Sequence, residues 1–106
     1  MIIDFCKALG EETRIRIILM LCQEEMCICE LMEQLNLSQT AISHHVKILK
    51  QAGLVKDRRN GKWNFYSIDK RGFTRQFRRL HKEIMLPVEQ YEHNSKAEPK
   101  VKCPFD

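Results

Sequence analysis

A helical pattern followed directly by a hairpin pattern, from Leu37 to Ile68, constrains the fold of this 106-residue chain most. Ser38 is a favoured helix N-cap and Gly53 a favoured helix stop, so together they predict a helix between them. Asn60-Gly61 is the strongest short-range hairpin signal, because both residues of a type I′ turn need a positive φ. We therefore expect a hairpin over residues 54–68 with Asn60 and Gly61 as its turn.

Three more helices are predicted before this segment. Residues 2–9 form a short apolar helix that ends at Gly10. The second helix opens at Glu11-Glu12-Thr13 and is apolar nearly all round, which predicts a central, buried helix with Cys22 as a small core residue. The third, residues 28–36, carries Ile28, Leu31, Met32 and Leu35 at the i, i+3, i+4, i+7 spacing of one buried face. A three-residue joint separates it from the next helix, as in a helix-turn-helix.

The charges of the chain are unevenly distributed. Residues 1–37 carry three basic and seven acidic side chains, residues 38–82 carry twelve basic and two acidic ones, and residues 83–106 carry three basic and five acidic ones. A basic middle segment is typical of a surface that binds phosphates, although a solvated surface has the same composition. No acidic residue occurs from Ser38 to Lys56, which favours an anionic partner.

One face of the helix after Ser38 carries hydrogen-bonding side chains. Thr40, Ser43, His44 and Lys47 share this face, and Gln39 stands at the helix start, where recognition helices contact base edges. Ile42, Val46 and Leu49 form the inward face. At the hairpin tip, the basic residues Arg58, Arg59 and Lys62 suit a wing that reaches the minor groove or the flanking phosphates. The alternative is a charged edge that prevents aggregation.

A fifth helix is predicted from Asp69 to about Leu86, with Phe73, Phe77, Leu80 and Ile84 as its apolar stripe. Pro87 is expected to end or kink it. We expect one domain over residues 1–93, with residues 94–106 as a flexible tail that carries Cys103. No apolar run is long enough for a membrane span, and the N-terminus does not resemble a signal peptide, so we expect a cytoplasmic protein.

The five cysteines include two that lie one residue apart, Cys27 and Cys29, at the start of the third helix. In a reducing compartment such thiols are typical of metal binding or redox chemistry. Residues two apart on an ideal helix point about 200° apart. Two sulfurs on one ion lie within about 4.6 Å of each other, so joint binding requires a distorted first turn. A third sulfur ligand would come from Cys103 or, alternatively, Cys6.

The segment from Leu9 to Ile68 resembles the ArsR/SmtB family of bacterial metal-responsive repressors. The resemblance rests on ALGEETRIRIILML, CICELMEQLNLSQTAISHHVKILKQAGLV and RRNGKWNFYSI. It implies a mainly α, winged helix-turn-helix fold (ααααββα) and a homodimer that pairs through its first and last helices. It also implies binding to double-stranded operator DNA that is lost when an inducer binds. By resemblance, the recognition-helix positions are Gln39, Thr40, Ser43, His44 and His45, and the wing positions are Arg58, Arg59 and Lys62. Together with Ser38 and Lys47, which lie on the same helix, these are the expected DNA-binding residues.

Cys27-Ile28-Cys29 matches the cysteine core of the family's arsenic and cadmium sensors, but Met32 stands where these usually have a third cysteine. An all-sulfur site selects soft ions. Three thiolates suit trivalent arsenic or antimony, and four suit cadmium, lead or zinc. The resemblance therefore implies an arsenic- or antimony-responsive repressor with no constitutive cofactor, and a cadmium, lead or zinc sensor is the alternative.

The same DNA-binding segment would also suit a repressor that responds to thiol oxidation instead of a metal ion. Cys27 or Cys29 can form a disulfide or polysulfide bridge with Cys103, which would make the chain a redox or persulfide sensor. A thiol oxidoreductase is disfavoured, because its cysteine motif usually follows a strand in a βαβ unit and this one lies among helices. A metallochaperone would not need the basic helix and hairpin, so we expect that the chain is not an enzyme and acts on transcription.

Overall fold

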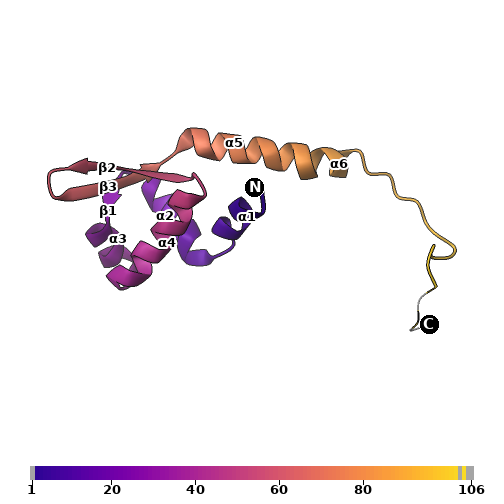
Figure 1. Ribbon diagram of the computed structural model, residues 1–106, viewed down its shortest axis with the longest axis horizontal. Coiled ribbons are helices and arrows are strands. Elements are labelled where there is room, and N and C mark those ends of the chain that lie inside the picture. Colours follow the sequence, from indigo (N-terminus) through magenta and orange to yellow (C-terminus); the bar gives the residue numbers. More distant parts are fainter. Residues whose placement is uncertain (1, 103, 105–106) are drawn as a thin grey trace.

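A computed structural model describes residues 2–102 and 104 of the chain. Helices α1–α4 and a small sheet form one body, and the last helical segment extends away from it (Figure 1). The elements in chain order are α1 (Ile2–Leu9), α2 (Glu12–Leu21), β1 (Met26–Cys27), α3 (Ile28–Leu35), α4 (Gln39–Gln51), β2 (Val55–Asn60), β3 (Trp63–Ile68), α5 (Lys70–Leu80), a π-helical segment (His81–Met85) and α6 (Leu86–Glu89). The predicted helices and hairpin are all present.

Side-chain caps fix where the helices begin. The Ser38 hydroxyl accepts the Ala41 N–H at 3.1 Å at the start of α4, and the Asp69 carboxylate accepts the Gly72 N–H at 3.0 Å at the start of α5. Each cap satisfies a backbone donor that the first helical turn leaves free. The left-handed φ of 53° at Asn36 ends α3, so α3 and α4 are joined by a tight turn.

The sheet has three antiparallel strands in the order β1-β3-β2, one more than the hairpin predicted from the sequence. The extra strand, β1, pairs Met26 with Tyr66 and Cys27 with Phe65. It has two residues, both buried, so it shows no alternation of polar and apolar positions that sequence analysis could detect. The pairing joins the start of α3 directly to the hairpin.

The hairpin turn lies one residue later than expected. Asn60 pairs with Trp63, so Gly61 and Lys62 form the two-residue loop. Gly61 has a φ of 63°, and Asn60 is not among the described residues with a positive φ. A single positive φ at the first loop position is what a type II′ turn requires, and glycine supplies it without strain. The expectation that Asn60 is a turn residue was therefore wrong.

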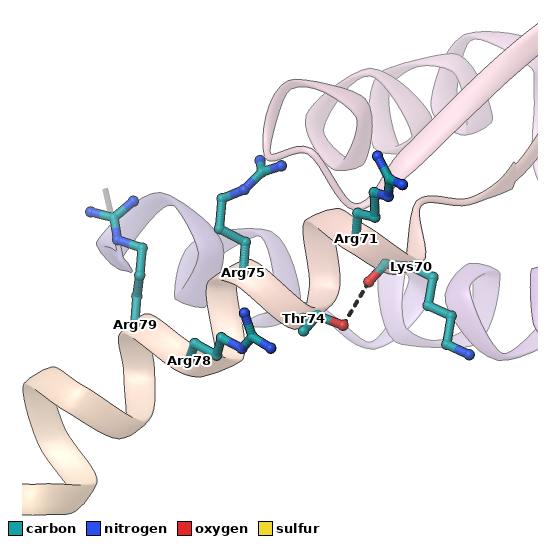
Figure 2. Close-up of a pocket in the computed structure, with 6 residues that line it drawn as sticks. All are labelled: Lys70, Arg71, Thr74, Arg75, Arg78 and Arg79. Carbon is teal, nitrogen blue, oxygen red and sulfur yellow. Dashed lines mark hydrogen bonds between the residues drawn. The ribbon is translucent and has the colours of Figure 1, made fainter.

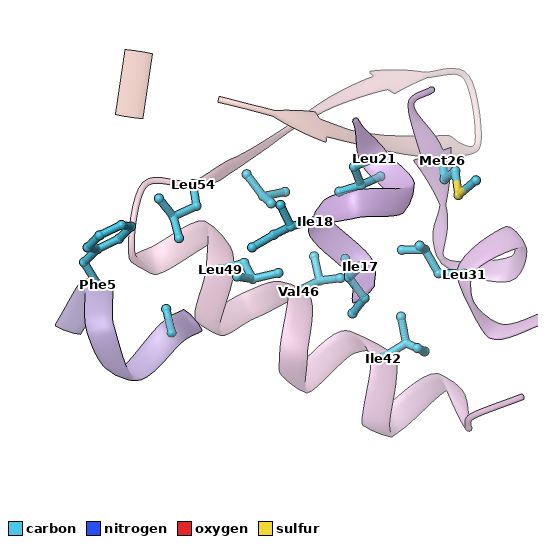
Figure 3. Close-up of a cluster of buried hydrophobic side chains, with 12 residues drawn as sticks. Phe5, Ile17, Ile18, Leu21, Met26, Leu31, Ile42, Val46, Leu49 and Leu54 are labelled. Carbon is cyan, nitrogen blue, oxygen red and sulfur yellow. The ribbon is translucent and has the colours of Figure 1, made fainter. Parts of the chain in front are cut away.

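The core lies between α1, α2, α3, α4 and the sheet, and the largest fully buried side chains are Phe5, Ile17, Leu31, Ile42, Leu49 and Leu54 (Figure 3). The inward face predicted for α4 is confirmed, because Ile42, Val46 and Leu49 are all buried. Met32 is partly buried and packs against this cluster, as a core residue would.

The second helix is not buried all round. Ile15 and Leu19 are exposed, Leu19 by 60%, and Cys22 is also exposed. These residues are spaced i, i+4, i+7 and therefore share one face, while Ile17, Ile18 and Leu21 supply the buried face. The prediction that Cys22 is a core residue was wrong, because α1, α4 and β3 pack on the other face of α2 and leave this face uncovered.

The last helix continues past Pro87. Proline lacks an N–H, and in an α-helix its ring would clash with the carbonyl four residues before it. Here a π-helical turn, His81–Met85, precedes the proline, and the helix then runs to Glu89. Within residues 2–102 no helix has the length and apolar character needed to cross a membrane.

Candidate nucleic-acid interface and thiol pair

The exposed face of α4 is the first part of the candidate site. Ser38, Gln39, Thr40, Ser43, His44 and Lys47 are all exposed. Because α4 packs on α2, α3 and β2 through its apolar face, these side chains point away from the body. A helix that presents only hydrogen-bond donors and acceptors, without a carboxylate, suits base edges and phosphates of a major groove.

His45 lies apart from this set, because its side chain is only 17% exposed. Its Nδ1 atom lies 3.2 Å from Arg14 Nη1 and 3.8 Å from a Glu11 carboxylate oxygen. Arg14 also donates from Nε to the Ala8 carbonyl at 2.7 Å and from Nη2 to the Lys7 carbonyl at 3.1 Å. Arg14 therefore connects the end of α1 to α4 through its contact with His45. One sequence cannot reveal this link, since the partners lie 6 to 31 residues apart.

This environment makes the fold sensitive to pH. Burial of the imidazole lowers the pKa of His45 below its ordinary value of 6.5, the charges of Arg14 and His44 lower it further, and Glu11 opposes the shift. Near and below pH 6.5 the unfolded chain therefore binds more protons than the folded chain. We expect the free energy of unfolding to be fully retained above 6.5 and to fall as the pH drops through that value. Urea denaturation of His45→Asn should show a weaker fall. The control His93→Asn, which replaces an exposed histidine that does not act on His45, should show the fall of the wild type. Parallel pH profiles for wild type and His45→Asn would contradict this assignment.

The hairpin is the second part of the candidate site. Arg58, Arg59 and Lys62 are exposed along and beyond β2, and Lys62 Nζ lies 5.2 Å from the centre of the Trp63 ring. The Arg58 side chain is engaged in an ion pair within the chain. Its Nε donates to a Glu25 carboxylate oxygen at 3.1 Å, and its Nη2 pairs with the other oxygen. Its guanidinium also lies 5.1 Å from the centre of the Phe65 ring. The pair lowers the pKa of Glu25 through the Arg58 hydrogen bond and raises the pKa of Arg58.

The thiol pair spans the junction of β1 and α3. Cys27 is 9% exposed and is both the last residue of β1 and the N-cap of α3, with an extended backbone (φ −88°, ψ 169°). Cys29 is exposed in the first turn of α3. Glu30 reaches back to accept the Cys27 N–H at 3.1 Å. Cys27 is therefore held by its neighbours while Cys29 is open to solvent.

The third sulfur ligand is not brought to this pair by the described part of the chain. Cys6 is exposed on α1, and Cys103 lies outside the described residues. Within residues 2–102 and 104 no group of three histidine, cysteine or acidic side chains is arranged to hold a metal ion. Glu25 was not singled out from the sequence, yet it lies two residues before Cys27 and connects the thiol segment to the wing.

The helix-turn-helix, the three-stranded sheet and the exposed polar face of α4 define a winged helix-turn-helix DNA-binding protein. Residues 11–57 match the family model described as bacterial regulatory protein, arsR family. An uncharacterized HTH-type transcriptional regulator of Methanocaldococcus jannaschii is 48% identical over 66 residues, which cover 61% of this chain and 74% of that protein. The chain belongs to the arsR family of bacterial regulatory proteins.

Two further relatives have more specific names. The arsenical resistance operon repressor of Escherichia coli is 42% identical over 67 residues, covering 62% of this chain and 57% of that protein. The cadmium resistance transcriptional regulatory protein CadC homolog of Staphylococcus aureus is 39% identical over 64 residues, covering 59% of this chain and 53% of that protein. The chain thus spans little more than half the length of these two relatives.

Solved structures show the same fold. The crystal structure of a possible transcriptional regulator for arsenical resistance superposes with a TM-score of 0.68 at 29% identity and covers 84% of this chain and 98% of that one. The homodimeric winged helix-turn-helix domain of a possible ArsR-family regulator from Mycobacterium bovis superposes with a TM-score of 0.63 at 26% identity, over 87% of this chain and 85% of that one. The predicted fold class is confirmed. The homologues and fold neighbours are DNA-binding transcriptional regulators and not enzymes, as expected.

Proposed function

We propose that this chain is a repressor that binds operator DNA as a homodimer and leaves it when trivalent arsenic or antimony binds to cysteine thiolates. The observation that carries the proposal is the position of Cys27 and Cys29 at a junction shared by the helix-turn-helix and the wing. The names of the arsenical resistance relatives support the choice of ion.

The DNA-binding part of the proposal assigns α4 to the major groove and the hairpin to the flanking minor groove or phosphates. Gln39, Thr40, Ser43, His44 and Lys47 would contact DNA directly. Arg59 and Lys62 would do so from the wing, together with Arg58 when it leaves Glu25. His45 would act by holding α4 in place, because Arg14 and Glu11 already surround its ring.

The dimer part of the proposal rests on apolar side chains that the described chain leaves exposed. Ile3 on α1 and Phe77, Ile84, Met85 and Val88 on the last helical segment are each between 42% and 58% exposed. A protein of this size rarely leaves so many large apolar side chains in water. Pairing through the first and last helices would bury them in a second copy.

The inducer would act by moving the junction of β1 and α3. Two sulfurs on one ion must approach to within about 4.6 Å, whereas here one thiol is buried and the other is exposed. Because Cys27 pairs with Phe65 and donates its N–H to the Glu30 carboxylate, drawing it toward Cys29 would disturb both α3 and the sheet that supports the wing. The metal-bound and DNA-bound states would then favour different arrangements of one element, which is the condition for coupling. A hundredfold loss of operator affinity needs about 2.8 kcal/mol of coupling.

The proposal predicts that Cys27→Ser combined with Cys29→Ser removes the response to the inducer. Serine is a good N-cap and nearly isosteric with cysteine, so the variant should fold and bind the operator like the wild type. Fluorescence anisotropy of operator DNA under strict reduction should show release of the wild type by arsenite and no release of the double variant. Cys22→Ser, which removes an exposed thiol elsewhere, should respond like the wild type.

The same assay separates the alternatives. Release by cadmium, lead or zinc but not by arsenite would change the proposed inducer and leave the proposed thiol site unchanged. Release by a persulfide donor, lost in Cys103→Ser, would favour the redox sensor. Near-ultraviolet absorption of the metal-bound protein counts thiolate ligands, and comparing Cys103→Ser with Cys6→Ser would identify the third one. Unchanged release of the double variant by arsenite would reject the thiol pair.

A further inference from the structure

A stripe of cations runs along one face of α5 and is not used by the proposed operator contacts. The residues Lys70, Arg71, Thr74, Arg75, Arg78 and Arg79 line a hollow of about 580 Å³ on this helix. We call this set the basic stripe. Figure 2 shows Arg71, Arg75 and Arg79 extending to one side of the helix as one row, and Lys70, Thr74 and Arg78 following the neighbouring side as a second row.

The cations of the basic stripe are not neutralised within the described chain. Among residues 2–102 and 104, none of the five forms an ion pair, and Thr74 uses its hydroxyl to bond the Lys70 carbonyl at 3.0 Å. No acidic residue occurs from Lys70 to Lys82. Arginines four residues apart repel each other and weaken an isolated helix. A surface helix usually avoids this repulsion by alternating charges, so the pattern points to an anionic partner.

The basic stripe lies entirely on α5 and shares no residue with the exposed polar face of α4. The apolar residues Phe73 and Phe77 lie about 140° around an ideal helix from the centre of the stripe. They turn toward the body, where Phe77 meets Phe5 at 5.2 Å between ring centres. Dimer pairing through the apolar side of the helix would therefore leave the cations facing outward.

The chemistry of the basic stripe favours a phosphate polymer over an acidic protein. Four of its five cations are arginines, whose planar guanidinium groups bind phosphate in a bidentate manner. Residues four apart on a helix advance about 6 Å, so Arg71, Arg75 and Arg79 offer regularly spaced charges to a regularly charged polymer. Protein interfaces place apolar and aromatic side chains at their centre, and the stripe has only Thr74 there.

We propose that the basic stripe binds the phosphate backbone of duplex DNA outside the segment read by α4. This inference rests on the proposed function, because the stripe would act together with the DNA contacts proposed for α4 and the wing. The duplex is either the flanking part of the same molecule or a second molecule, and the chemistry of recognition is the same for both. Such a contact would strengthen binding to long DNA without adding sequence specificity.

The test removes one charge from each row, with Arg75→Gln and Arg78→Gln in one variant. Both side chains are exposed and unpaired in the described chain, so thermal denaturation should show an intact fold. Lys96→Gln with Lys100→Gln is the matched control, because it removes the same charge from another exposed segment. The DNA probes are a short duplex that ends at the operator's edges and a longer duplex with random flanks, each titrated over a series of salt concentrations. A third arm adds a separate random duplex to the complex with the short operator.

We expect Arg75→Gln/Arg78→Gln to bind the long duplex about tenfold more weakly than the wild type. The slope of log K against log salt should become shallower by about 3.6, because the variant removes two charges from each protomer of the proposed dimer and each phosphate contact contributes about 0.9. Binding of the short duplex should be unchanged, and the control should bind both probes like the wild type. Loss confined to the long duplex identifies flanking DNA, and loss of capture of the separate duplex identifies a second molecule.

Two results would overturn the inference. In the first, Arg75→Gln/Arg78→Gln loses equal affinity for the short and long duplexes, and the wild type captures no second duplex. In the second, the variant and the Lys96→Gln/Lys100→Gln control bind all probes equally well. Failure of the proposed function would look different, since the wild type itself would then show no preference for any operator.

Discussion

Replacing Gly72 with alanine is expected to lower the free energy of unfolding by about 3 kcal/mol or more. A Cβ at this position would lie 1.7 Å from the Gly53 carbonyl oxygen and 2.9 Å from its carbon, which no rotation of a side chain can relieve. Gly53 cannot move freely, because it lies in the turn between α4 and β2 and adopts the left-handed φ of 76° that this turn requires. Urea denaturation should therefore show a much lower midpoint for Gly72→Ala.

Gly10→Ala provides the matched control for this substitution. Its added Cβ would lie 3.2 Å from the Cys6 carbonyl oxygen, which is tight but can be accommodated by a small shift. We expect a change within about 1 kcal/mol, because alanine also reduces the conformational entropy of the unfolded chain. If Gly72→Ala were as stable as Gly10→Ala, the close approach of α5 to the α4–β2 turn would not exist in solution.

Arg14→Met is expected to lower the free energy of unfolding by about 2 to 3 kcal/mol, because it removes charge-assisted hydrogen bonds to two backbone carbonyls. The bonds from Nε to Ala8 and from Nη2 to Lys7 close the end of α1, and Nη1 contacts His45 on α4. Methionine keeps most of the aliphatic stem, so the loss reports on the guanidinium. Thermal and urea denaturation measure the change.

Arg16→Met is the control, since Arg16 is exposed on the same helix. It should change stability by no more than about 0.5 kcal/mol. A further readout is specific to the network: the His45 pKa, measured by NMR, should rise in Arg14→Met, because the Arg14 charge helps to lower it. Equal stabilities of the two variants, with an unmoved His45 titration, would show that Arg14 does not link α1 to α4.

The sequence predicted the helices and hairpin because these depend on local patterns. Caps at Ser38 and Asp69 and the apolar spacing of Ile42, Val46 and Leu49 are all readable within one or two turns. The two-residue strand β1 was missed, because its existence depends on pairing with residues about 40 positions away. The exposure of Ile15, Leu19 and Cys22 was missed for a similar reason, since apolar side chains alone do not say which face a neighbour covers.

The candidate site was predictable in composition more than in geometry. The polar face of α4 and the basic hairpin were found from residue types and spacing. The partners that organise them were not found, because Arg14 with His45 and Glu25 with Arg58 are pairs separated by 31 and 33 residues. Only the folded chain brings these residues together. The thiol pair was found from its spacing, but the burial of Cys27 depends on its place in β1.

The wide turn before Pro87 has a consequence for how this protein can vary in length. A π-helical turn is geometrically a normal helix that has absorbed one additional residue. Removing one residue from His81–Met85 would restore ordinary helical winding there and leave Val88 and its neighbours pointing in the same direction. A deletion of a single residue at this point would therefore not rotate the end of the last helix.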